Sequence, residues 1–303
     1  MDELQYYPVL REFEKMDDIL FETNRSIMDG VVFSKDKSIL MKAPEELTGR
    51  YSIPDGVEKI HWSAFADCDS IIEITIPGSV KVIGADAFMR CRSLTRITME
   101  EGVNIIGTQA FGCCTSLTSI TIPSSVQFIY GEAFNRCRSL KSVSIPENVL
   151  EISYMVFNYC PSLTDIFVDK NNRNYVDIDG VLFSRDMEML IKVPEGKDCA
   201  SYVIPDGVRE FDHEAFDGVK ALKHITVPGS MTTIGASAFV GCESLESVTF
   251  LDGVTRIESG AFMRCDSLMH VSIPNSVEEV SMEAFDGCDM LSEDTKKRIE
   301  ERR

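Results

Sequence analysis

Cysteine is the residue type in this sequence with the widest chemical scope, since a thiol can act as a nucleophile, a redox centre or a metal ligand. The 303 residues include ten Cys, and no two of them form the Cys-x-x-Cys spacing typical of zinc sites. Eight recur at one position of a repeated segment: Cys68, Cys91, Cys114, Cys137, Cys160, Cys242, Cys265 and Cys288. We expect these eight to be free and buried, because free Cys behaves as a small hydrophobic residue.

Cys113 and Cys199 lie outside that repeated position and are the candidates for a reactive surface thiol. A Cys-dependent hydrolase that uses one of them is the enzymatic alternative. The sequence has no Gly-rich phosphate loop, no His-Glu-x-x-His pair and no Gly-x-Ser-x-Gly elbow. We therefore expect no enzyme activity, no catalytic residue, no bound metal and no cofactor.

The four histidines are His61, His213, His224 and His270. The last two occupy equivalent positions two repeats apart, with Ser247 between them. Two steps across a parallel sheet span roughly 10 Å, which is too far for one shared metal ion. We count His224 and His270 among the candidate residues for binding a protein partner.

Basic side chains gather after two of the repeated Phe residues, in a chain with a formal net charge of −19. The predicted basic ridge comprises Arg90, Arg92, Arg96, Arg136, Arg138 and Lys141, with Arg264 further along the chain. Guanidinium groups bind carboxylates through two parallel hydrogen bonds, so the ridge could receive an acidic segment of a partner. The alternative is that these side chains pair with neighbouring carboxylates of the chain itself, where each exposed pair contributes little.

A repeat of 23 residues positions all of these side chains. Phe recurs at this spacing twice, and Phe216 follows Phe157 by 59 residues, which is one repeat plus an insertion. Cys follows three residues after each Phe, except where Val219 replaces it, and Leu or Ile follows after six. Stacked repeats would place each Phe over the next and form a continuous core. The Phe positions are Phe65, Phe88, Phe111, Phe134, Phe157, Phe216, Phe239, Phe262 and Phe285.

Each repeat also contains a short run in which β-branched residues alternate with Thr or Ser, a pattern that predicts a strand. Pro often follows and would end the strand. The residues between the buried positions form an outward column, namely Thr75, Thr98, Thr121, Ser144, Phe167, Thr226, Thr249 and Ser272. Such a column stabilises a sheet, and it also offers a flat strip to a protein partner. Phe167 interrupts it with an aromatic side chain of the type enriched in interface hot spots, unless the following insertion covers that ring. Gly84, Gly107 and Gly235 recur in register and are expected in turns.

Two insertions match each other, at 29–47 and 179–197, and each predicts a β-hairpin on the stack. The sequence thus divides into an N-terminal cap of helix and first strand (1–28), a super-repeat with five Phe units (29–165), a second with four (166–291) and a helical C-terminal cap (292–303). Ser292 is the expected N-cap of the last helix. A helix over Pro8–Asp18, with Leu10 and Phe13 on one side, is the N-terminal candidate, and the alternative is that both ends are frayed.

Composition excludes several classes of function. A chain with a pI near 4.6 repels phosphate, so we expect no nucleic-acid partner. No apolar run approaches the roughly 20 residues of a membrane span, and the first residues lack the basic and apolar parts of a secretory signal. A row of free thiols suits a reducing compartment. We expect a cytoplasmic monomer or weakly self-associating protein, with a secreted or cell-surface location as the alternative if a signal is missing from this sequence.

The unit Ile-Pro-x-Ser-Val-x-x-Ile-Gly-x-x-Ala-Phe-x-x-Cys-x-Ser-Leu, seen over Ile76–Leu94, resembles the BspA-like leucine-rich repeats of bacteria, which include those of Treponema. The resemblance covers roughly residues 19–291. It implies a curved, right-handed β-solenoid with parallel strands on one face, here with two hairpin insertions and helical terminal caps. It also implies a non-enzymatic scaffold that binds a macromolecular partner. The alternative from the same resemblance is a cell-surface adhesin for host or matrix proteins.

Overall fold

The computed structural model describes residues 25–212 and 214–302. The chain divides into two compact units, each described by itself below. Unit 1 is formed within Met1–Cys137 and Asn148–Val156, and unit 2 within Arg138–Glu147 and Phe157–Arg303. The predicted helix over Pro8–Asp18 and His213 lie outside the described residues.

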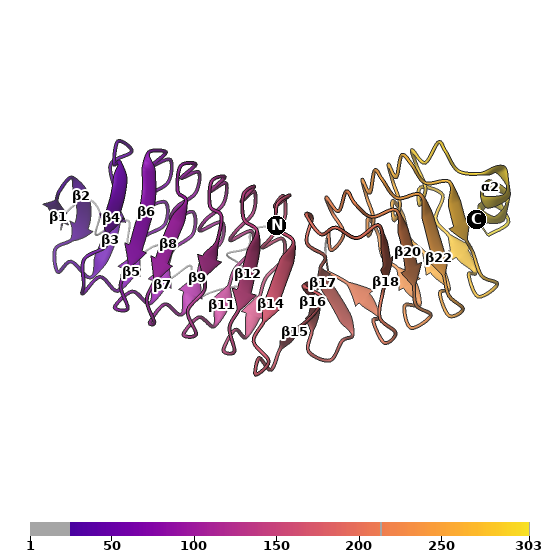
Figure 1. Ribbon diagram of the computed structural model, residues 1–303, viewed down its shortest axis with the longest axis horizontal. Coiled ribbons are helices and arrows are strands. Elements are labelled where there is room, and N and C mark those ends of the chain that lie inside the picture. Colours follow the sequence, from indigo (N-terminus) through magenta and orange to yellow (C-terminus); the bar gives the residue numbers. More distant parts are fainter. Residues whose placement is uncertain (1–24, 213, 303) are drawn as a thin grey trace. The chain divides into compact units, whose positions relative to one another are not determined.

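Each repeat of unit 1 contributes one longer strand and one two-residue strand, and the two kinds of strand form separate parallel ladders (Figure 1). The longer strands are β4 (Gly49–Ser52), β6 (Ile71–Ile76) and β8 (Arg96–Met99), and the equivalent strand of the next repeat, β10 (Ile120–Thr121), is shortened to two residues. The short strands are β5 (Lys59–Ile60), β7 (Val82–Ile83), β9 (Ile105–Ile106), β11 (Phe128–Ile129) and β13 (Glu151–Ile152). Partner residues on adjacent strands are one repeat apart, as in the pair Thr75 and Thr98. Unit 1 is thus a stack of parallel strands, as the sequence predicted.

Unit 2 repeats this arrangement. Its longer strands are β12 (Ser142–Ile145), β14 (Asp165–Val168), β18 (Ser201–Val203), β20 (His224–Val227), β22 (Ser247–Phe250) and β24 (His270–Ser272). Its short strands are β19 (Glu210–Phe211), β21 (Thr233–Ile234), β23 (Arg256–Ile257) and β25 (Glu279–Val280). Strands β18, β20, β22 and β24 form one parallel sheet in sequence order. The strands of this unit are again held in register at the repeat spacing.

The two insertions fold alike, as antiparallel strands that join the short-strand ladder. The first contains β2 (Val31–Ser34) and β3 (Ile39–Lys42), and the second contains β16 (Val181–Ser184) and β17 (Met189–Lys192). A further antiparallel strand precedes each, β1 (Arg25–Met28) and β15 (Tyr175–Ile178), which the sequence analysis did not include in the inserted elements. The last strand of each insertion then pairs in parallel with β5 or β19. The insertions are therefore part of the sheet and do not simply lie on the stack.

The repeated Phe side chains form the centre of each core. All nine are buried. In unit 1 the rings of Phe65, Phe88, Phe111 and Phe134 follow one another with centroids 4.9, 5.2 and 5.4 Å apart and nearly parallel planes. In unit 2 the corresponding distances along Phe216, Phe239, Phe262 and Phe285 are 4.9, 4.9 and 5.1 Å. Such distances fall in the favourable range for aromatic pairs. The prediction that Phe88, Phe111 and Phe134 contact one another in sequence is confirmed.

The repeated cysteines run beside the Phe core. All ten Cys are free, and the eight in the repeated position are buried. The thiol of Cys91 donates to the carbonyl oxygen of Phe65, 26 residues earlier, at 3.1 Å. Four more thiols repeat this bond at 3.0–3.2 Å, those of Cys114, Cys137, Cys265 and Cys288. The prediction that the cysteines of the repeated position are buried is confirmed.

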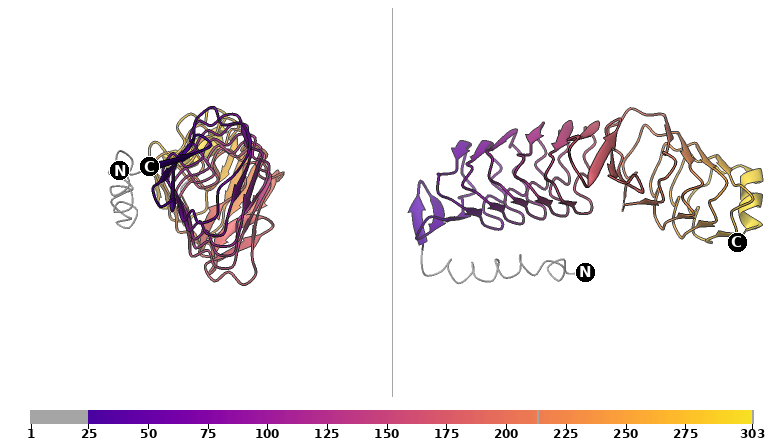
Figure 2. Two further views of the ribbon diagram at one scale, coloured as in Figure 1. Left: turned by 90° about the vertical axis from the view of Figure 1, so that its left-hand side faces the viewer. Right: turned by 90° about the horizontal axis from the view of Figure 1, so that it is seen from below.

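The helix α2 (Glu293–Glu300) lies at the end of the stack of unit 2 (Figure 2). The Oγ of Ser292 accepts a hydrogen bond from the backbone N–H of Thr295, which is the expected N-cap. Ile299 is 3% exposed and belongs to the core of this unit. The Oγ1 of Thr295 accepts from the backbone N–H of Val271, so α2 contacts the last strand of the sheet.

Candidate functional site

The outward column is exposed on the longer strands of both units. Its members alternate with fully buried neighbours, as in β8, where Thr98 is exposed between buried Ile97 and Met99. Six members are exposed and two are half-buried, the latter being Thr75 and Thr226. The prediction that these side chains face away from the core is confirmed.

Two apolar side chains occupy the outward column in unit 2, one on each side of the second insertion along the chain. Phe167 on β14 is 49% exposed, and Val203 on β18 is 65% exposed. Val203 pairs in register with Thr226, so it occupies the position that elsewhere holds Thr or Ser. The exposed position of Val203 was not predicted from the sequence. It could have been, because Ile204–Pro205 aligns with Val227–Pro228 one repeat further on, which places Val203 at the position of Thr226.

The second insertion covers the backbone edge of β14 but leaves the Phe167 ring half-exposed. The N–H of Ile166 donates to the carbonyl of Gly180 at 2.9 Å, and the N–H of Val168 donates to Oδ1 of Asp177 at 2.7 Å. Ile178, in the same insertion, is 41% exposed. The alternative that the insertion covers Phe167 is therefore wrong for its side chain.

The two histidine candidates share a column next to this strip. His224, Ser247 and His270 are partners in register on three neighbouring strands, and both histidines are exposed. Nδ1 of His224 lies 2.9 Å from Oγ of Ser247. Within the described residues no group of three or more His, Cys, Asp or Glu side chains is placed to hold a metal ion. The column can therefore offer hydrogen bonds to a partner.

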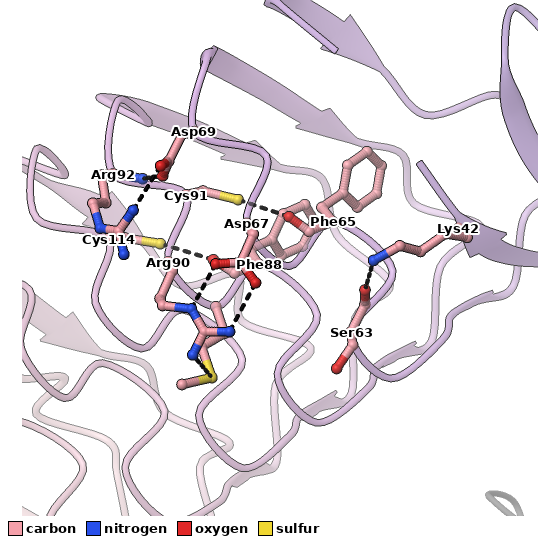
Figure 3. A network of polar contacts seen from close by, with 11 residues as sticks. Lys42, Ser63, Phe65, Asp67, Asp69, Phe88, Arg90, Cys91, Arg92 and Cys114 are labelled. Atoms are coloured by element: carbon pink, nitrogen blue, oxygen red, sulfur yellow. Dashed lines mark hydrogen bonds and ion pairs between the residues drawn. The ribbon is translucent and has the colours of Figure 1, made fainter. Parts of the chain in front are cut away.

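The basic ridge is partly neutralised by carboxylates one repeat earlier (Figure 3). Arg90 donates two hydrogen bonds to Asp67, at 2.6 and 2.7 Å, and Arg92 donates one to Asp69 at 2.6 Å. The bond from Arg90 lowers the pKa of the Asp67 carboxyl. Arg96 lies 3.8 Å from Glu73. For these three arginines the alternative of pairing within the chain describes the structure.

The other ridge residues, Arg136, Arg138 and Lys141, are also exposed. Arg138 is equivalent to Arg92, but the residue one repeat earlier is Thr115, where Arg92 has Asp69. Neither Arg138 nor Lys141 forms an ion pair with any described residue. These two side chains keep the predicted capacity for an acidic partner, which stays a prediction.

The cysteines outside the repeated position show no sign of activation. Cys113 and Cys199 are half-buried. Burial raises the pKa of the Cys199 thiol, whereas reactive cysteines have a lowered pKa that favours the thiolate. The raised pKa of Cys199 thus gives no support to a thiol-dependent reaction at that residue. The described part of the chain also contains no helix with the length and apolarity of a membrane span.

Comparison with known proteins identifies a matching family model and several solved structures with a similar fold. A family model described as "BspA type Leucine rich repeat region" matches residues 48–178 and 195–301. A leucine-rich cell surface protein of Faecalibacterium prausnitzii A2-165 has a similar structure, with 23% identity over 91% of this chain and 97% of the other and a TM-score of 0.52. The pneumococcal vaccine antigen PcpA is 19% identical over 92% of this chain and 96% of the other, with a TM-score of 0.57. A leucine-rich repeat protein of Bacteroides ovatus ATCC 8483 is 24% identical over 88% of this chain and 79% of the other, with a TM-score of 0.54.

These structural similarities, all below 25% identity, support the fold alone. No curated protein sequence matched the chain. The family model, in contrast, covers well over half of the residues, and it includes every repeat that carries the stacked Phe and the buried Cys. The chain therefore belongs to the BspA-type leucine-rich repeat family.

Proposed function

We propose that this protein is a non-enzymatic interaction scaffold that binds a protein partner through the outward column of unit 2. The observation that carries the proposal is the pair Phe167 and Val203, which are 49% and 65% exposed in a column otherwise composed of Thr and Ser. Ser52, the counterpart of Val203 after the first insertion, is polar. The apolar character of the strip is thus specific to the second insertion.

The outward column is preorganised for binding. Parallel strands in register hold the column without a partner, so binding would order few side chains and would lose little conformational entropy. A half-exposed aromatic ring and an exposed Val gain free energy when a partner removes them from water. The hydroxyl of Thr226, the register partner of Val203, and that of Ser144, the register partner of Phe167, can donate and accept hydrogen bonds beside these apolar anchors, as polar groups do at the rim of an interface.

Affinity capture with paired variants tests this proposal. The full chain is immobilised as wild type, as the double variant Phe167→Ser with Val203→Ser, and as Leu251→Ser. Leu251 is 46% exposed in the same unit but outside the column, so it is a matched control for lost apolar surface. We expect proteins captured by the wild type and by Leu251→Ser to be lost from the double variant. Equal capture by all three forms would refute this surface.

A cell-surface adhesin is the second candidate. It is favoured by the family membership and by the likeness to a protein described as a leucine-rich cell surface protein. The ten free thiols favour the cytoplasm instead, which we propose as the main location. Protease treatment of intact cells, followed by detection with an antibody, separates the two. If protease-treated cells contain less full-length protein than untreated cells, the result supports the adhesin. If the two amounts are equal, the protein is protected from the protease, and the result supports the cytoplasmic scaffold.

The net charge of −19 leads us to propose further that the partner is not a nucleic acid. Within the predicted basic ridge, three of the arginines are paired with carboxylates of the chain itself, namely Arg90, Arg92 and Arg96, which reduces the positive charge that the ridge could offer to phosphates. We also propose a monomer or weak self-association, which light scattering over a range of concentrations would check.

A further inference from the structure

A cluster of charged groups is buried where the second insertion meets the repeat of Phe157, inside unit 2. Lys192, the last residue of β17, is 4% exposed. Its Nζ donates to the carbonyl oxygens of Glu214 at 3.0 Å and of Asp217 at 3.4 Å. A buried ammonium without a neutralising environment is costly, and burial is the main cause of a lowered pKa at Lys192. The groups around Lys192 therefore decide its charge state.

Glu195 is the second buried member. It is 8% exposed, and its burial raises its pKa more strongly than Lys192 and the nearby backbone N–H groups of Cys160 and Tyr159, in the repeat of Phe157, lower it. Gly218 lies against it, since a Cβ at that glycine would come within 2.7 Å of the Glu195 side chain. One oxygen, Oε1, is buried and has no hydrogen-bond partner. An unsatisfied buried carboxylate oxygen costs free energy unless the group is neutral or paired.

A second carboxylate oxygen in the same place is also unsatisfied. Oδ2 of Asp217 is buried without a partner. The third carboxylate, Glu214, accepts a hydrogen bond from Nδ2 of Asn158, which is 1% exposed. Buried Glu195 and the half-buried side chains of Asp217 and Glu214 are thus the acidic neighbours of Lys192, and the thiols of Cys160 and Cys242 are the remaining titratable neighbours among the described residues. With every carboxylate ionised, the cluster would carry an uncompensated negative charge.

The first insertion shows that this burial is not required by the repeat itself. Lys42 is equivalent to Lys192, and its Nζ donates to the carbonyl of Ser63 at 3.0 Å, as Lys192 does to Glu214. Glu45, the counterpart of Glu195, is exposed. In the second insertion the turn after Phe157 packs on this segment, and the N–H of Gly196 donates to the carbonyl of Leu163. The polar cluster is therefore a property of this contact alone.

We propose that the cluster takes up one proton when unit 2 folds and holds it on Glu195 at neutral pH, so that the contact between the second insertion and the repeat of Phe157 tightens in mild acid and loosens as the pH rises. The proton reduces the excess negative charge by one and turns one unsatisfied oxygen of Glu195 into a donor. No metal is needed for this balance, in keeping with the absence of a metal-binding group among the described residues.

The direction of the pH effect follows from linkage. Burial raises the pKa of Glu195 above its ordinary value near 4.5. Between pH 4.5 and the folded pKa, the folded state therefore binds more protons than the unfolded state. The stabilisation is fully present below pH 4.5 and is lost as the pH rises through the folded pKa. Within this window the opening equilibrium changes by at most about tenfold per pH unit, the limit for one proton. The lowered pKa of Lys192 acts in the opposite direction at alkaline pH.

Infrared spectroscopy of the full chain in heavy water tests whether the proton is present. A protonated carboxyl group has a carbonyl band that ionised carboxylates lack. At pH 7 we expect this band in the wild type and in the control Glu45→Gln, and its loss in Glu195→Gln. Absence of the band from the wild type at pH 7 overturns the proposal, whether or not the variants fold.

Hydrogen exchange measured by mass spectrometry tests the consequence. After correction for intrinsic rates, peptides covering 190–200 should lose protection as the pH rises from about 4.5, the ordinary pKa of Glu, to about 7, by up to about tenfold per pH unit, in the wild type and in Glu45→Gln. In Glu195→Gln the protection should be nearly independent of pH over this range, since Gln cannot ionise. The same pH dependence in Glu195→Gln as in the wild type would contradict the assignment to Glu195.

Discussion

At the scale of single residues, the repeated Cys combines two properties that Val or Ala cannot provide. Its side chain is small and apolar enough to be buried, and its thiol donates to a Phe carbonyl of the preceding repeat, as Cys114 does to Phe88 at 3.2 Å. The same carbonyl also accepts the backbone N–H of Cys91 at 3.2 Å, so the thiol is a second donor to an oxygen with two lone pairs. Val219, at the one repeat without Cys, supplies the volume but not the donor.

Thiol labelling is the first test at this scale. With a water-soluble disulfide reagent such as dithionitrobenzoate, we expect native protein to react at Cys113 and Cys199, which are half-buried, and not at the eight buried cysteines. All ten should react after unfolding in urea. Peptide mapping identifies the sites. Rapid labelling of Cys91 or Cys114 in native protein would contradict the buried thiol row.

Backbone conformation at the turn after Phe gives a second test. Cys113 has φ of +60°, in the left-handed region, and the equivalent positions of three other repeats hold Gly218, Gly241 and Gly287. A residue with a Cβ pays about 1–2 kcal/mol there, partly offset by the greater freedom of Gly in the unfolded chain. We expect Cys113→Gly to raise the free energy of unfolding by roughly 0.5–1 kcal/mol relative to Cys113→Ala. Urea unfolding of both variants measures this difference, and equal midpoints would contradict it.

At the scale of elements, close backbone approach distinguishes glycines that look equivalent in the sequence. A Cβ at Gly107 would lie 2.7 Å from the backbone carbon of Gly84, whereas a Cβ at Gly235 would meet nothing within 4 Å. Gly107→Ala should therefore force neighbouring coils apart, at a cost of roughly 1–3 kcal/mol. Gly235→Ala is the matched control and should change stability little. Thermal unfolding of both variants checks the contrast, and similar losses in Tm would argue against it.

The elements also show which features could be predicted from sequence. The Phe, Cys and Thr columns were predictable because each repeat presents the same residue type to the same neighbour, so one local pattern describes every contact along the stack. A first strand was predicted within 1–28, where β1 lies, but its counterpart β15 was not predicted, because its pairing depends on the inserted residues that follow it. The pairing of Arg90 with Asp67 was only one of two alternatives, since it requires knowing which turns lie side by side.

The buried cluster at Lys192 was missed altogether, for a related physical reason. Lys42 and Lys192 stand in nearly identical sequences, and only the presence of a preceding repeat makes the second one buried. The exposure of Val203 could have been predicted by aligning the Ile-Pro pair that follows it. That the second insertion leaves the Val203 side chain exposed is seen only in the structure. A local motif predicts the position of a side chain in a repeat, whereas its burial depends on what packs against that repeat.

At the scale of the whole molecule, the row of buried thiols predicts a loss of stability in alkaline solution. Burial raises the pKa of Cys68 to about 11 and of Cys242 to about 12, above the ordinary value of 9.0. Between these values the unfolded chain has lost thiol protons that the folded chain keeps, so the free energy of unfolding decreases as the pH rises. Each such thiol contributes up to about 1.4 kcal/mol per pH unit.

Urea unfolding between about pH 8 and about pH 10.5 measures this effect. We expect the midpoint to fall steeply above about pH 9, and the slope for Cys68→Ala to be smaller by close to one proton, because that variant has one buried thiol fewer. The Trp62 side chain, beside the core of unit 1, provides a fluorescence signal for the unit that contains Cys68. A midpoint that is constant up to pH 10.5 would mean that the thiols ionise in the folded protein, which is incompatible with a closed core.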